Sequence, residues 1–253
     1  MPERKPAVRG IAALSLLAAV SACTTSSHPE PEPTSRAPSS ASSAPPACSP
    51  RVLESGFNRS GADFWFGYIV ENPCDQAAVQ NYVVVQPMTA SGNPVGQPKD
   101  VLPGLPVLLP GQRIGIGGLV HLTQDPQTVA SLSFKVQDND LVPATTFAAW
   151  PRSVTARNIT HDAADAGGTV PLTFDVVTDP PNAPLCQPTA QIIARDKAGH
   201  IVYGTFERIT GPTVSLSVKL PASADLTKTE IYVEQGQYVF GKDLKGVACG
   251  TAP

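Results

Sequence analysis

The sequence has few of the residue patterns that catalysis and metal binding need. It has four histidines in 253 residues and no Gly-x-Ser-x-Gly nucleophile motif. The segment "GQRIGIGG" (111–118) lacks the Lys-Ser/Thr end of a P-loop and the third glycine of a dinucleotide fingerprint, so we predict that its glycines allow close packing or a bulge in a strand. No two cysteines lie two to four residues apart, as metal sites require. These absences favour a non-enzymatic protein without a metal or a bound cofactor.

Long apolar runs are missing beyond residue 22. Before that point, Arg4, Lys5 and Arg9 precede the apolar run "GIAALSLLAAVSA" (10–22). A basic start followed by an apolar run of this length is typical of a signal peptide, whereas a membrane-spanning helix needs about 20 apolar residues. A transmembrane anchor, and an ordinary secretory signal with a stray cysteine after it, are the two alternatives.

The end of this run, "VSAC" (Val20, Ser21, Ala22 and Cys23), resembles the lipobox of bacterial lipoproteins. The resemblance implies that residues 1–22 are a signal peptide that is cut off, and that the Cys23 thiol receives a diacylglycerol. This covalent lipid is the only non-protein group we expect. Acyl chains contribute about 0.8 kcal/mol per buried methylene, and two or more chains give stable anchoring. We therefore expect lipid anchoring at the extracytoplasmic face of the cell membrane.

Residues 23–47 are rich in Ser, Pro and Ala and contain no large apolar side chain. Such a segment buries too little surface to offset its ordering entropy, so we predict a disordered tether after the lipidated Cys23. Cutting off residues 1–22 removes three of the 18 basic and one of the 21 acidic side chains, which leaves a net charge of about −5. This charge gives no electrostatic basis for binding nucleic acid.

Residues 48–253 consist of short β-prone runs separated by Gly and Pro. In "DFWFGYIVEN" (63–72) both faces of the alternating pattern are apolar, which predicts a central strand. In "TVSLSVKL" (213–220) one face is apolar and the other polar, as in a half-buried strand. Strands about every ten residues favour immunoglobulin-like β-sandwiches of roughly 100 residues each. We therefore predict an all-β chain with two tandem sandwiches, residues 48–150 and 151–253.

A weak internal repeat supports two similar halves. Segments 67–96 and 173–204 each contain a strand, then Asn and Pro near a cysteine, then two strands around a glycine turn. In the first half, "GYIVEN" (67–72), "VVVQPMTASGNPVG" (83–96) and "LLPGQRIGIGGLV" (108–120) resemble the FxLYD-type domains of bacterial surface lipoproteins. The resemblance implies a small immunoglobulin-like sandwich in a family not known for catalysis.

The cysteine count also depends on the lipobox. If Cys23 is lipidated, four cysteines remain: Cys48, Cys74, Cys186 and Cys249. Four cysteines allow three pairings. The predicted domain boundary favours one bridge in each half, Cys48–Cys74 and Cys186–Cys249, and a crossed pairing between the halves is the alternative.

The segment 101–122, "VLPGLPVLLPGQRIGIGGLVHL", is very apolar for a loop followed by a strand. Its side chains either pack under the sandwich edge or between domains, or form an exposed patch for a partner protein or a lipid-like ligand. The candidate patch residues are Leu102, Leu105, Val107, Leu108 and Leu109.

These features favour a non-enzymatic, membrane-anchored cell-envelope lipoprotein that binds or assembles with another envelope protein. The second hypothesis is a carrier of a small apolar or lipid ligand at residues 101–122. An enzyme with an unrecognised site is the least supported class.

Overall fold

The computed structural model describes residues 48–60, 63–79, 82–96, 107–122, 124–137, 140–185 and 187–235. These residues belong to one compact unit of the chain. They form β-strands joined by turns, and their only helices are two single-turn 3₁₀ helices, Pro126–Thr128 and Ala144–Phe147. The prediction of an all-β chain is therefore confirmed.

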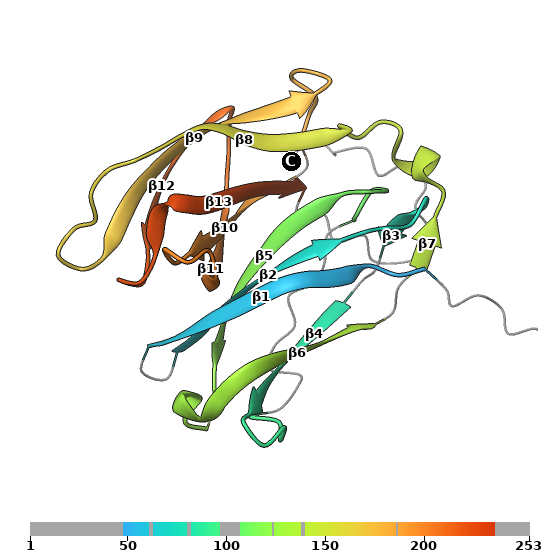
Figure 1. The fold of residues 1–253 in the computed structure, drawn as a ribbon. Helices are drawn as coiled ribbons and strands as arrows, with labels where there is room; N and C mark the ends of the chain where they lie inside the picture. The colour runs from blue at the N-terminus through green and yellow to red at the C-terminus, as the bar shows by residue number, and fades with distance from the viewer. Residues whose placement is uncertain are drawn as a thin grey trace, which may run out of the picture. The chain divides into compact units, whose positions relative to one another are not determined.

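The strands before residue 150 form a sheet with a second layer against one of its faces (Figure 1). The sheet has the order β1-β2-β5, with bounds β1 Arg51–Ser60, β2 Asp63–Glu71 and β5 Arg113–His121. The second layer pairs β4 Tyr82–Thr89 with β6 Val129–Gln137, and β3 Ala77–Val79 with β7 Asp140–Val142. The two pairs share one register and are successive parts of the same antiparallel ladder.

The strands after residue 150 form one six-stranded sheet with the order β11-β10-β13-β8-β9-β12. Their bounds are β8 Ser153–His161, β9 Thr169–Asp179, β10 Pro188–Arg195, β11 Ile201–Arg208, β12 Thr213–Lys219 and β13 Asp225–Gln235. Only one residue pair, Tyr232 with Thr155, joins β13 to β8. The sheet bends there, and β8-β9-β12 encloses an apolar core with β10, β11 and β13.

The two groups of strands share one connectivity. Strand order β1-β2-β5 corresponds to β8-β9-β12, and the pairing of β3/β4 with β6/β7 corresponds to that of β10 with β13. In the N-terminal group Leu108 bridges Ala78 of β3. This bridge corresponds to the pairing of β11 with β10 in the C-terminal group. The two segments of the sequence repeat, 67–96 and 173–204, therefore occupy corresponding strands.

Strand β2 is the central strand that its sequence predicts. Phe64, Phe66, Tyr68 and Val70 face the β4/β6 layer and are at most 1% exposed. The rings of Phe64, Phe66 and Tyr68 form a row in which neighbouring centroids are 6.5 and 6.3 Å apart. Burying each such side chain contributes about 1.5–3 kcal/mol, so this row is the main apolar anchor of the N-terminal strands.

The other face of β2 and β5 packs on the sheet formed by β10, β11 and β13 (Figure 1). Sheets with side chains at their facing positions pack about 10 Å apart, but here glycines bring backbone against backbone. A Cβ atom on Gly204 would lie 2.5 Å from the Phe66 carbonyl oxygen and 2.7 Å from the Gly67 Cα. A Cβ atom on Gly117 would overlap the Thr205 amide nitrogen. The predicted close packing is confirmed for Gly115, Gly117 and Gly118 of β5, whereas Gly111 lies in a turn before the strand with open space around it.

Gly117→Ala tests this contact. The added methyl group meets backbone atoms of β11 that no rotamer change can move, so we expect a loss of at least about 2 kcal/mol in the free energy of unfolding, measured in urea. Ser217→Thr adds a methyl group to an exposed position of β12 and should change stability by less than about 0.5 kcal/mol. Equal stability of the two variants would contradict the close packing.

Candidate functional site

Several residues singled out in the sequence lie outside the described part of the chain: Cys23, Cys186, Cys249, Leu102 and Leu105. The bridge Cys186–Cys249 stays a prediction. The other expected bridge is present, with the Cys48 and Cys74 sulfur atoms 2.04 Å apart. It ties the residues before β1 to the turn after β2. Closing a loop of 26 residues stabilises the fold by roughly 3 kcal/mol in the chain-entropy model.

Asn72 organises the turn that carries Cys74. It is fully buried, its Nδ2 donates to the carbonyls of Gln76 at 2.9 Å and Leu108 at 2.8 Å, and its Oδ1 accepts from the Cys74 amide at 3.1 Å. A buried amide with all these partners is stabilising, whereas an unpaired one costs about 1–3 kcal/mol. The Asn-Pro-Cys signal in the sequence marked this turn, but the role of the asparagine was missed.

The expected apolar patch needs correction at its three described residues. Leu108 is fully buried and exchanges two backbone hydrogen bonds with Ala78. Val107 is 7% exposed and packs with Phe147 and Trp150, and Leu109 lies against the same cluster. These side chains extend the second layer of the N-terminal strands, because the chain here runs as a short strand beside β3. Val107 and Leu108 are core residues and offer no surface to a partner, whereas Leu109 is partly buried.

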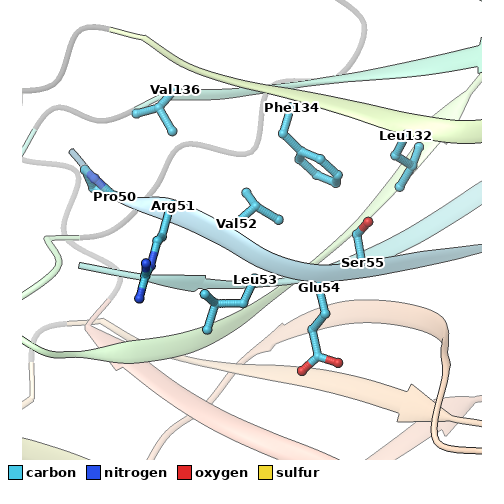
Figure 2. A pocket seen from close by; sticks show the side chains of 9 residues that line it. All are labelled: Pro50, Arg51, Val52, Leu53, Glu54, Ser55, Leu132, Phe134 and Val136. Carbon is cyan, nitrogen blue, oxygen red and sulfur yellow. The ribbon is translucent and has the colours of Figure 1, made fainter. Parts of the chain in front are cut away.

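A different apolar surface is open to solvent, between the edge strands β1 and β6. A groove of about 470 Å³ runs between them, lined by Pro50, Arg51, Val52, Leu53, Glu54, Ser55, Leu132, Phe134 and Val136. In Figure 2, Val52 points from β1 toward Phe134 of β6, whereas Leu53 and Glu54 point to the opposite side of β1. The groove offers apolar contact to an occupant, with Ser55 as the one hydroxyl among its lining side chains.

The groove exists because β1 and β6 are not paired with each other. Among the described residues, each strand has one neighbour, β2 and β4 respectively, and a free outer edge. Arg59 of β1 donates to the Val129 carbonyl at the start of β6, which holds one end of the two strands together. In the C-terminal group the corresponding strands, β8 and β13, do pair. The groove therefore marks an edge that stays open only in the N-terminal group.

The sequence alone did not reveal this groove. Leu132, Phe134 and Val136 alternate in "SLSFKVQD" (131–138), which predicted a strand but not what the strand faces. The opposite wall comes from residues about 80 positions earlier. The one local signal was the alternation of these three apolar side chains. The alternation places them inward, but the structure shows them only half-buried.

Charged side chains join β1 to the C-terminal sheet beside the groove. Arg195, 11% exposed at its side chain, donates to both Glu54 oxygens at 2.8 and 2.7 Å and to Glu230 at 3.2 Å. Arg113 is the second cationic partner of Glu54, at 2.9 Å. The Arg195 hydrogen bonds, opposed by partial burial and aided by the charges of Arg195 and Arg113, hold the pKa of Glu54 below its ordinary value. These charged side chains pair with one another, and the pairs fix the position of β1 and β5 on the C-terminal sheet.

Other kinds of site were sought in the same part of the chain. The described residues contain no group of three or more His, Cys, Asp or Glu side chains that could hold a metal ion. None of the helices described is long and apolar enough to cross a membrane.

Comparison with known proteins gives no relative. No protein-family model matches the chain, and neither the curated proteins nor the solved structures include a significant match. The function is therefore inferred from the sequence motifs, the fold and the groove.

Arg195→Leu tests the charged link. It leaves Glu54 and Glu230 without their shared partner, and we expect a loss of about 2 kcal/mol in unfolding free energy at pH 7. Because the folded-state pKa of Glu54 is lowered, its contribution is present above its unfolded value and is lost as the pH falls. The variant should therefore lose less stability on acidification than the wild type. Arg51→Leu, which breaks the exposed Arg51–Glu71 pair, should cost under about 1 kcal/mol. Equal losses in both variants would show that the Arg195 link carries no special weight.

Proposed function

We propose that this chain is a lipid-anchored cell-envelope protein that binds another envelope protein and has no catalytic activity. One observation carries the proposal: the short apolar run that follows three basic residues ends in "VSAC", with Cys23 at the lipidation position. In this proposal residues 1–22 are removed, the thioether-linked diacylglycerol on Cys23 holds the chain on the extracytoplasmic face of the membrane, and residues 24–47 act as the tether.

The folded part supports a binding role. Its all-β construction and the shared strand order of its two halves fit two immunoglobulin-like sandwiches of the FxLYD type. Immunoglobulin-like sandwiches host many functions, so the role is argued from the site. The groove between β1 and β6 is the open apolar surface that the described strands offer, and we place the contact with the envelope partner there.

The second candidate is a carrier of a small apolar or lipid molecule. The volume of the groove, about 470 Å³, falls within the usual range of roughly 300–1,000 Å³ for small-molecule sites. We place this candidate in the groove between β1 and β6, because Val107 and Leu108 are buried. Another part of the expected location, residues 101–106, lies outside the described residues.

Cys23→Ser tests the anchor. Without a thiol to accept the diacylglycerol, we expect the protein to leave the membrane fraction or to remain as an uncut precursor without lipid. Both outcomes are visible by fractionation and by mass spectrometry of the intact chain. Ser21→Ala keeps a small residue at its lipobox position and should stay lipidated and membrane-bound. A Cys23→Ser protein that is processed and membrane-bound like the wild type would overturn the lipoprotein assignment.

Site-specific photocrosslinking tests the binding surface. A photoreactive side chain at Phe134, which lines the groove, should crosslink one defined envelope protein in cells, and the crosslink should weaken when Val52→Asp is added. The matched control is Ser133, whose side chain is exposed on the other face of β6. Equal crosslinking from both positions would contradict a groove-specific partner. Crosslinking to lipid, together with a co-purified apolar ligand in native mass spectrometry, would favour the carrier.

A further inference from the structure

A buried carboxyl group lies where the C-terminal sheet meets the edge of β5. Glu234 of β13 is 9% exposed. Its Oε1 accepts from Gln191 Nε2 at 2.6 Å, and Gln191 Oε1 accepts from the Gly117 amide at 2.8 Å. A chain of two hydrogen bonds thus runs from β13 through β10 to the free edge of β5. This chain closes one end of the glycine contact between the two sheets.

Two polar atoms at this place have no hydrogen-bond partner. Oε2 of Glu234 and the hydroxyl of Tyr68 are both buried and unpaired. Tyr68 belongs to the fully buried row of β2. Burial, and after it the charge of Glu234, raises the pKa of Tyr68 well above its ordinary value, so the carboxyl and the phenol lie within electrostatic reach of each other.

Among the described residues, no basic side chain lowers the pKa of Glu234. The neutral Gln191 faces its carboxyl group from β10 and the glycine backbone faces it from β5. Tyr68 of β2 points to the opposite face of its sheet and senses only the charge of Glu234. The neighbouring charged side chains on this face, Glu230 and Arg195, are bound to each other. Burial is opposed only by the Gln191 hydrogen bond and raises the pKa of Glu234 to about 7.

We propose that Glu234 is a pH-sensitive latch between β13 and the edge of β5. In the closed state its carboxyl group is protonated, and the hydrogen-bond chain to Gly117 is intact. When the group loses its proton, the negative charge needs water or a donor that Oε2 does not have in the closed structure. Separation of the two sheets at this end would let water reach the carboxylate, so ionisation favours the open state.

The sign of the pH dependence follows from the raised pKa. Above the unfolded value of 4.5 the open state loses its proton first, so the closed state is destabilised progressively as the pH rises to about 7. The opening equilibrium should increase roughly tenfold per pH unit in this window and level off above it. At the other end, the hydrogen bonds from Arg195 to Glu54 and Glu230 hold the sheets together.

Hydrogen exchange on the full-length protein tests the latch. We expect protection of the β5 amides, Gly117 among them, to fall between pH 5 and 8 on the order of 50-fold after correction for the intrinsic exchange rate. Glu234→Gln copies the protonated carboxyl and should remove this fall. Glu207→Gln, an exposed change on the neighbouring β11, should behave as the wild type does.

The outcomes are distinct. A Glu234→Gln protein that keeps the wild-type pH dependence would overturn the latch, and so would exchange that changes only at the end of β13 and not in β5. If that variant does not fold, the carboxyl carbon of Glu234 in the wild type can be titrated by NMR. A midpoint near 7 supports the latch, and a midpoint near 4.5 overturns it.

Discussion

Backbone contact between Gly67 and Gly117 on one sheet and Gly204 on the other is the constraint on which the arrangement of the described strands depends. Gly67 and Gly117 are opposite each other in the β2–β5 register. A slip of β2 against β5 by one residue would turn either Phe66 or Ile116 into the contact and its neighbouring glycine into the core. The glycines therefore fix both the spacing of the two sheets and the pairing of the strands within one of them.

The contact is apolar in its middle and polar at its two ends, and the ends differ. Ile69, Ile193 and Ile201 fill the middle. At one end Arg195 lies between two carboxylates, so both signs of charge are present and each has a partner. At the other end Glu234 is an acid bound by the neutral Gln191, and no basic side chain of the described residues lowers its pKa. Apolar packing gives most of the free energy, whereas the polar ends set the position of one sheet on the other.

The sequence was sufficient for features with a local cause. The two apolar faces of 63–72 placed β2 at the centre of its sheet, and the glycines of 111–118 predicted a close contact. Long-range features had no local signal. For Val107 and Leu108 the sequence left both packing and an exposed patch open, because their burial depends on the pairing of Leu108 with β3 and on the Phe147–Trp150 cluster. The groove joins residues 50–55 to residues 132–136, which are far apart in the sequence. Glu234 is the last residue but one of an ordinary alternating strand, and only the packing of β5 against that strand buries it.

The same connectivity closes one edge in the C-terminal strands and leaves it open in the N-terminal ones, and Tyr232 shows why. Tyr232 pairs with Thr155 of β8, its ring fills the space above Gly115, and its hydroxyl donates to Glu230. The contact with β5 thus holds β13 where it can meet β8. Strand β6 lies in the layer on the other face of the β1-β2-β5 sheet and gains no such support. On the facing strand β1, a bulge at Leu53 interrupts the ladder with β2, and bulges are a common protection of edge strands against indiscriminate pairing. An edge that is apolar, open and guarded in this way suits selective binding better than aggregation.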